Sequence, residues 1–285
     1  MDAVPGPRGA GAAAAYVSVP CFVWHLPCSW SAVAQAVSHP RPVRDWSSLI
    51  AEGRWRIYRE VLDEAEAREI PFAIGGAFAV ATYTGHWRDT KDIDLYVLPP
   101  HRERMIAVLG ALGFTDYYKK LPYDRWWIYR GTKDDTIVDV IWAMANHRQR
   151  IDGLWMSGRE SEIHGRCVKV LPPEALLWDK LYILQRDRCD WPDVLNLLYA
   201  TGADLDWRYV LERIGADMAL LAGALAVFRW IAPGRAGSLP PWLWERVGLA
   251  PGAEAEPPGP VPEIDARRAS LLDTRPWFRP ERGKT

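Results

Sequence analysis

Two acidic residues at the start of an apolar stretch, Asp92 and Asp94, are the residues of this sequence best placed to do chemistry. The stretch Ile93–Leu98 is a predicted strand, which Pro99 and Pro100 end. Successive side chains of a strand point to opposite faces, so both carboxylates project to one side while Ile93 packs beneath them. Two carboxylates on one edge predict a site for a divalent metal ion.

A glycine pair, Gly75–Gly76, precedes these acids by about fifteen residues. Phe72–Ile74 is a predicted strand, and the pair would turn it into a helix over about Ala77–Tyr83. Glycine lacks Cβ and tolerates positive φ, so the backbone can approach a bulky anion closely. A helix start there would direct backbone N–H groups at a triphosphate. The pair could also be only a tight turn, which is its commoner use.

A third acid, Asp139, lies within the predicted strand Thr136–Trp142, on one face with Ile137 and Ile141. An aspartate between two isoleucines is a poor choice for a core unless it has a ligand. We expect Arg125–Arg130 to form the preceding strand, joined to this one by the turn-rich link Gly131–Asp135.

This order of Gly-Gly, Asp-x-Asp on a strand and a third Asp on a later strand resembles the nucleotidyltransferase superfamily. That fold is shared by antibiotic nucleotidyltransferases, DNA polymerase β and abortive-infection toxin transferases, and the resemblance covers about Ile57 to Leu198. It implies an α/β (α+β) fold, in which a mixed sheet flanked by helices is followed by an α-helical C-terminal subdomain. It also implies that Asp92 and Asp94 bind two Mg²⁺ ions, and that Asp139 holds the ion nearest the acceptor and could take its proton.

Further residues resemble parts of that family's nucleotide site. Arg88 and Thr90 match a frequent Arg-x-Thr-x-Asp form of the motif, although Thr90 could simply buttress the strand. Ala77 stands where family members often have a phosphate-binding Ser. Lys180 shares a face with the apolar stripe of a helix predicted from Pro173 to about Arg186, so it either snorkels to solvent or meets an anion. It resembles the family lysine that meets the triphosphate.

A short run after that lysine resembles the toxin-type transferases. The run consists of Arg186, Asp190 and Asp193. Asp193 follows Pro192, however, and is equally well placed to stabilise a helix N-terminus.

The organisation predicted along the chain has four parts. Residues 1–45 form a poorly ordered extension, 46–172 the catalytic domain, 173–232 a helical subdomain and 233–285 a flexible Pro/Gly-rich tail. The helical subdomain includes one long helix over about Trp207–Trp230, and helices are also predicted before Pro71 and over Arg102–Leu112. The uncharged stretch Gly9–Pro40 fits neither a membrane span nor a secretory signal, so no membrane partner is expected.

Composition restricts the partners and the compartment. The chain carries 36 acidic and 35 basic residues, a formal net charge of -1, so no overall field attracts nucleic acid or membrane. A nucleic-acid acceptor would need a local basic patch. Four cysteines without a CxxC pair favour a reducing, cytoplasmic location. The absence of Gly-x-Ser-x-Gly, Walker and Rossmann motifs argues against serine hydrolases, P-loop ATPases and dinucleotide-dependent dehydrogenases.

The resulting prediction is a Mg²⁺-dependent enzyme that moves a nucleoside monophosphate from a triphosphate such as ATP onto a hydroxyl and releases pyrophosphate. The acceptor would be a small molecule such as an antibiotic, or RNA, and a protein partner is expected if the chain is toxin-like. The near-zero net charge tilts slightly towards the small acceptor. Two alternatives stay open: a metal-dependent glycosyltransferase, which also uses Asp-x-Asp, and a non-catalytic module that binds a nucleotide or a protein.

Overall fold

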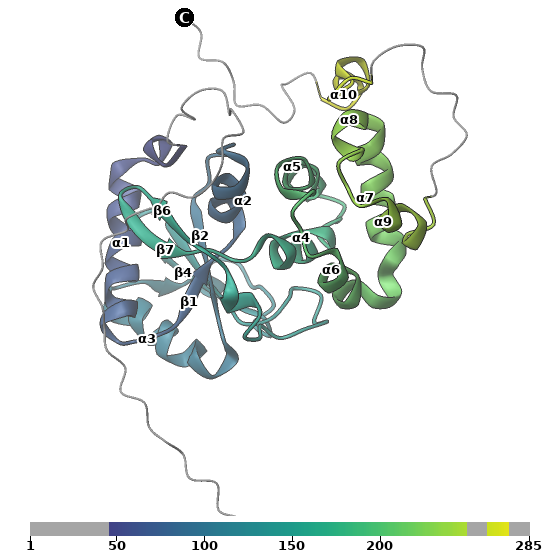
Figure 1. The fold of residues 1–285 in the computed structure, drawn as a ribbon. Coiled ribbons are helices and arrows are strands. Elements are labelled where there is room, and N and C mark those ends of the chain that lie inside the picture. Colours follow the sequence, from purple (N-terminus) through teal and green to yellow (C-terminus); the bar gives the residue numbers. More distant parts are fainter. Residues whose placement is uncertain (1–45, 250–260, 274–285) are drawn as a thin grey trace, which may run out of the picture. The chain divides into compact units, whose positions relative to one another are not determined.

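Five strands form one mixed sheet in the computed structural model, which describes residues 46–249 and 261–273 (Figure 1). The strand order is β1-β2-β5-β4-β3, with β2 and β5 parallel and the other neighbours antiparallel. The strand bounds are β1 Phe72–Ile74, β2 Asp92–Val97, β3 Thr115–Asp116, β4 Ile128–Lys133 and β5 Thr136–Ile141. The predicted strand at 93–98 is thus confirmed, shifted by one residue.

A separate antiparallel pair, β6 Glu160–Ile163 and β7 Arg166–Lys169, follows the sheet in the chain. Its end is tied to β1, because the N–H of Leu171 donates to the carbonyl of Ile74 at 2.9 Å. The chain then leaves the strands for the helical C-terminal half.

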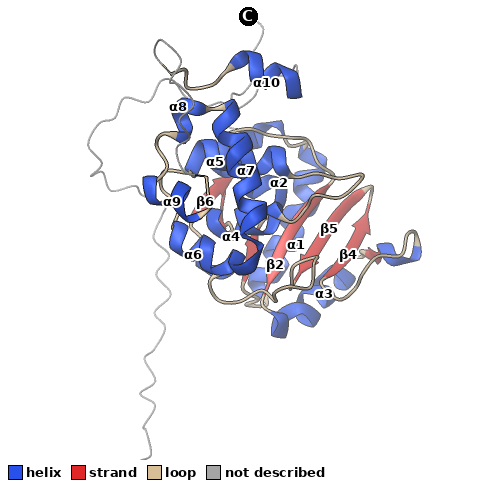
Figure 2. Ribbon diagram, turned by 90° about the vertical axis from the view of Figure 1, so that its right-hand side faces the viewer, coloured by secondary structure: helices blue, strands red, loops and turns tan. Residues whose placement is uncertain are grey.

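Helices cover the two sides of the sheet differently (Figures 1 and 2). On one side α1 Glu52–Ala67 and α3 Arg102–Ala111 contact β5. These helices bury the residues that alternate with the acids, including Ile93, Leu95, Val138 and Val140. The acids therefore face the other side, where α2 Gly76–Thr84 contacts β2, α4 Pro173–Leu181 and α5 Trp191–Thr201. The helices predicted at 77–83 and 102–112 are confirmed.

The β4–β5 hairpin is tighter than the sequence suggested. Gly131, Thr132 and Lys133 belong to β4, so the predicted five-residue link is wrong. The turn consists of Asp134 and Asp135 alone, with φ values of 49° and 58°. A two-residue turn with positive φ at both positions matches the twist of the strands, and Asp is among the residues that adopt it.

Two helix predictions in the C-terminal half are corrected. Helix α4 ends at Leu181 instead of continuing to Arg186, because Leu184 pairs with Cys189 and the chain folds back there. The long helix predicted over 207–230 is two helices, α6 Trp207–Ile214 and α7 Met218–Ile231. Gly215, at φ 56°, ends α6, since a residue with positive φ cannot continue a right-handed helix.

The run Trp207–Ile231 is long and apolar enough to cross a membrane by length and composition alone. In the fold, apolar residues of this run are buried in the core, because α7 packs one face against the rest of the protein. That face consists of Leu221, Ala224, Leu225, Phe228 and Ile231.

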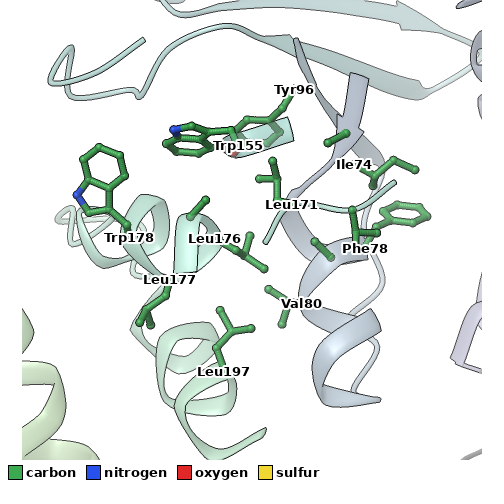
Figure 3. Close-up of a cluster of buried hydrophobic side chains, with 14 of the residues drawn as sticks. Ile74, Phe78, Val80, Tyr96, Trp155, Leu171, Leu176, Leu177, Trp178 and Leu197 are labelled. Carbon is green, nitrogen blue, oxygen red and sulfur yellow. The ribbon is translucent and has the colours of Figure 1, made fainter. Parts of the chain in front are cut away.

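One hydrophobic core runs through the sheet half and the helical half of the chain (Figure 3). Tyr96 of β2 stacks on Trp155, with ring centroids 5.7 Å apart, and Trp155 contacts Trp178 of α4 at 5.6 Å. Leu171 and Leu176 lie near Ile74 and Phe78 in the same cluster. The predicted boundary between residues 172 and 173 therefore crosses a continuous core, although the boundary itself stays a prediction.

Much of the predicted tail is folded. The structure has α8 Pro233–Ala236, α9 Pro241–Arg246 and α10 Ala266–Leu272 after Ala232. Leu239, Leu243 and Ala269 are buried there, so the expectation of a flexible segment is wrong for 233–249 and 261–273. The high Pro and Gly content of this segment suggested flexibility, but its few apolar residues pack against the rest of the core. The predicted extension at 1–45, and the tail at 250–260 and 274–285, lie outside the described residues.

The overall prediction of an α/β (α+β) fold with a mixed, helix-flanked sheet and C-terminal helices is confirmed.

Two neighbouring residues of α9 test whether this segment belongs to the fold. Leu243 is 0% exposed and Trp242 is 42% exposed. Leu243→Ala should lower the free energy of unfolding by about 2–5 kcal/mol, because it removes core contacts and leaves a cavity. Trp242→Ala should change it by about 0.5 kcal/mol or less. Urea titration of both variants measures the difference, and equal small effects would mean that α9 contributes nothing to stability.

Candidate active site

The three acids singled out in the sequence meet on one face of the sheet, in a row that crosses neighbouring strands. Asp94 of β2 is the register partner of Asp139 of β5, and Asp139 is the register partner of Arg130 of β4. Asp92 is two residues from Asp94 on the same strand and the same face. Strand pairing thus brings together residues that are far apart in the chain.

Arg130 holds Asp139 through both carboxylate oxygens. Its Nε–H donates to Oδ1 at 2.8 Å, and its terminal N–H donates to Oδ2 at 2.6 Å. Burial raises the pKa of the Asp139 carboxyl, and the Arg130 guanidinium opposes that rise. The hydrogen bonds that Arg130 donates to Asp139, together with the charge of Asp139, raise the pKa of Arg130. A bidentate pair of this kind fixes the carboxylate in orientation as well as in charge.

Asp94 lies next to the negative charges of Asp92 and Asp139. Burial raises its pKa well above the usual value, and the charges of Asp92 and Asp139 raise it further. Asp92 accepts a hydrogen bond from the Thr90 hydroxyl, so Thr90 does buttress the strand. Neighbouring carboxylates that repel one another favour a bound cation, because a positive ion relieves the repulsion.

The glycine pair is required because side chains of β2 lie too close to residues 75 and 76 to leave room for a Cβ. Gly76 has φ 55°, and a Cβ added to it would lie 1.6 Å from Oδ2 of Asp94. A Cβ on Gly75 would lie 2.2 Å from the ring of Tyr96. The start of α2 is therefore pressed against Asp94, and a helix start leaves its first N–H groups without intrahelical partners. This arrangement fits both the close-approach and the turn interpretations.

Lys180 points inward, as predicted, but carboxylates of its own half of the chain surround it. Its Nζ lies 2.8 Å from Asp190 and 2.7 Å from Asp193. Burial lowers the pKa of Lys180, but Asp193 and Asp190 outweigh burial and the net shift is upward. Asp193 thus binds a buried cation in addition to lying in the first turn of α5. The expectation that Lys180 contacts a triphosphate stays a prediction.

Arg188 is a second cation of this half whose charge acts on the acids, since both Lys180 and Arg188 lower the pKa of Asp94 and Arg188 also lowers that of Asp139. It lies in the short hairpin after α4 and bonds Asp190 at 3.1 and 3.0 Å, yet its side chain is 57% exposed. The hydrogen bond to Asp190 raises its pKa, and the charges of Asp94 and Asp92 add to the rise. Arg88 also reaches this region, 3.7 Å from Asp193. Arg186 is exposed, and the end of α4 at Leu181 leaves it outside the helix on which it was expected.

The donor set fits a divalent cation in part. Asp92 and Asp94 offer carboxylate oxygens on one face, and Mg²⁺ commonly takes one or two protein carboxylates, with water and phosphate completing its shell. Asp139 does not fit in this arrangement, because Arg130 occupies both of its oxygens. Within 46–249 and 261–273, no three His, Cys, Asp or Glu side chains form a metal-ligating group. A ligand role for Asp139 therefore stays a prediction.

Comparison with known proteins gives the family. Residues 56–230 match the sequence family described as "Uncharacterised nucleotidyltransferase". The chain belongs to this nucleotidyltransferase family. No curated protein matches it significantly.

Three solved structures are similar to this chain. The antibiotic-resistance factor ANT(2'')-Ia in solution is 22% identical, with a TM-score of 0.44, over 59% of this chain and 92% of that one. Lincomycin-bound LnuA, a lincosamide antibiotic adenylyltransferase, is 19% identical, with a TM-score of 0.38, over 50% and 94%. JHP933 from Helicobacter pylori is 13% identical, with a TM-score of 0.34, over 69% and 92%.

Sequence reasoning missed Arg130 and Arg188. Arg130 alternates with apolar residues in β4, and only the register of the hairpin shows that it meets Asp139. The sequence analysis singled out Arg186 instead of Arg188, because the predicted helix extended to about Arg186 whereas α4 ends at Leu181. The hairpin that replaces its last turn depends on the pairing of Leu184 with Cys189, which has no local motif.

The buried lysine gives a test that separates structure from ligand binding. Lys180→Met leaves Asp190 and Asp193 without their buried partner, so the free energy of unfolding without nucleotide should fall by about 3–5 kcal/mol. Exposed Lys169 is the matched control, and Lys169→Met should change stability by about 0.5 kcal/mol or less. A normal denaturation midpoint for Lys180→Met, combined with lost triphosphate affinity, would instead assign the lysine to the ligand.

Proposed function

We propose that this nucleotidyltransferase moves a nucleoside monophosphate from a triphosphate such as ATP onto a hydroxyl acceptor, with Mg²⁺ as cofactor and pyrophosphate as the second product. The observation that carries the proposal is the position of Asp94 against the start of α2, where Gly76 leaves no side chain between helix and carboxylate, with Asp92 on the same face of β2. An anion-binding helix end beside cation-binding acids suits a metal-complexed triphosphate.

Positively charged groups of the chain would bind the phosphates, and negatively charged groups would bind the metal ion. The first N–H groups of α2 and the guanidinium of Arg188 would hold the phosphates, with Arg88 at the outer edge of the same region. Asp92 and Asp94 would hold Mg²⁺, which when bound neutralises phosphate charge and polarises the phosphoryl group. The reaction forms a bond from the acceptor oxygen to the α-phosphorus and breaks the bond from that phosphorus to pyrophosphate.

Asp139 is the group best placed to take the proton of the acceptor hydroxyl. Each of its two oxygens accepts one hydrogen bond from Arg130 and keeps a second lone pair, which could take the proton of the hydroxyl. The acceptor hydroxyl would therefore approach from the side of β5 and β4. The hydroxyl would belong to a small molecule or to RNA, and we place the reaction in the cytoplasm on the cysteine usage of the sequence.

Label transfer tests the chemistry. With Mg²⁺, an α-labelled triphosphate and a panel of total RNA and hydroxyl-bearing antibiotics, Asp94→Asn should lower the rate of transfer about 10²–10³-fold. The fold should persist, because the substitution removes a buried charge that is disfavoured in the folded state. Circular dichroism checks the fold, and chelation of Mg²⁺ should abolish transfer by the unaltered enzyme.

Release of a nucleoside diphosphate instead of pyrophosphate would contradict the proposal and favour the glycosyltransferase alternative. Tight triphosphate binding without transfer to any acceptor in the panel would favour the non-catalytic module.

Two arginines two residues apart test the phosphate site. Arg188→Met should raise the dissociation constant for the Mg²⁺–triphosphate complex about tenfold or more, because it removes a charge that faces the acids. Arg186→Met, at an exposed position of the same hairpin, is the matched control and should leave affinity within about twofold. Isothermal titration measures both, and equal affinities would exclude Arg188 from the site.

A further inference from the structure

A group of aromatic and cationic side chains extends the catalytic row beyond β4. We name it the ledge, and define it as Tyr117, Tyr118, Lys120, Arg125 and Arg130. The Arg130 guanidinium lies 5.8 Å from the ring centre of Tyr117, and the Lys120 ammonium lies 5.9 Å from the same ring. Arg125 lies 4.0 Å from the ring centre of Tyr118. Each tyrosine thus has a cation over its ring.

Arg130 makes the ledge continuous with the proposed reaction centre. The same guanidinium that contacts Tyr117 binds Asp139, and Asp139 is the register partner of Asp94. Neighbouring strands lie about 4.8 Å apart, so two strand spacings, about 10 Å, separate Arg130 from Asp94 across the sheet. A molecule on the ledge would therefore present its end to Asp139, on the side assigned to the acceptor.

The ledge is held in place by its own hydrogen bonds. Asp116 accepts from the N–H of Tyr118 at 2.9 Å, from the hydroxyl of Tyr123 at 3.0 Å and from Arg125. The Tyr123 hydroxyl in turn accepts from the N–H of Arg130 at 2.8 Å. These bonds fix the positions of groups that remain accessible, since Tyr118 is 39% exposed and the side chain of Arg125 is 53% exposed. Such preorganisation reduces the entropy cost of binding.

The charge of this region differs from that of the whole protein. Residues 117–130 contain four cations, Lys119, Lys120, Arg125 and Arg130, against Asp124 alone, which is a net charge of +3. The complete chain has a net charge of -1. Six of the same fourteen residues are Tyr or Trp. This is the local basic patch that a nucleic-acid acceptor requires, and it would repel a polycationic small molecule.

We infer that the ledge binds the acceptor, and that the acceptor is the 3′ end of a single-stranded RNA. Exposed aromatic rings stack on bases, while neighbouring cations contact the phosphates between them. The terminal ribose of such a strand would present its hydroxyl to Asp139. The inference rests on the proposed nucleotidyl transfer and names its substrate class.

Equilibrium binding, measured without turnover, tests the assignment. A 3′-unmodified, 5′-fluorescein-labelled single-stranded RNA of twelve nucleotides would be titrated with the full chain by fluorescence anisotropy. Tyr118→Ala should raise the dissociation constant at least about fivefold, which corresponds to the loss of one stacked base. Arg125→Ala should weaken binding and reduce the slope of log affinity against log salt by about one, as loss of one phosphate contact requires.

Matched controls lie on other elements of the chain. Trp242→Ala removes an aromatic ring of similar exposure from α9, and Arg59→Ala removes a cation from the exposed side of α1. Both should leave RNA affinity unchanged, and the ledge variants should keep the affinity of the unaltered chain for the triphosphate. RNA binding that is absent, or that falls equally in ledge and control variants, would overturn the assignment.

The outcomes separate this inference from the proposed function. Ledge-dependent RNA binding without any label transfer would leave the ledge as an RNA site and count against the transfer reaction. Label transfer to an antibiotic, with no RNA binding, would support the transfer reaction and overturn the ledge assignment. Label transfer to RNA that is lost in Tyr118→Ala and retained in Trp242→Ala would support both.

Discussion

The repulsion among three carboxylates on two neighbouring strands is the constraint on which the rest of this structure depends. Asp92, Asp94 and Asp139 share one face of the sheet, and burial raises the pKa of both Asp94 and Asp139. Cations and hydrogen-bond donors around such a row offset the cost of burying its charges. The chain supplies them from several elements: Arg130 from β4, the Thr90 hydroxyl before β2, and Arg188 from the hairpin after α4.

The helical half of the chain is part of the site because it carries one of those cations. Buried Lys180 and Asp190, together with half-buried Asp193, form a set of charges that fixes the hairpin from which Arg188 projects. The hydroxyl of Tyr96 donates to Asp179 at 2.9 Å and joins β2 to α4 beneath the same region. Because Tyr96, Trp155 and Trp178 also share a core, a change in α4 would be transmitted to the strand that carries the acids.

Local charge is more informative than net charge for this protein. The near balance of acidic and basic residues favoured a small acceptor, yet residues 117–130 carry a net charge of +3 beside the row formed by Asp92, Asp94 and Asp139. Fields fall off within about 8–10 Å at ordinary ionic strength, so a substrate experiences the residues near the site and little of the rest.

The sequence by itself indicated the acids of the candidate site. Alternation places Asp92 and Asp94 on one face of β2 and sets Asp139 among the apolar residues of β5, and the pairing of β2 with β5 then puts all three acids on the same side of the sheet. The tertiary structure decided which cation meets which acid, because strand register and chain reversals depend on contacts between distant segments. Arg130 reaches Asp139 only through hairpin pairing, and a fold-back after Leu181 presents Arg188 in place of Arg186. The helices after Ala232 could not be predicted for the same reason. Their few apolar residues become buried only when the folded chain places α7 next to them.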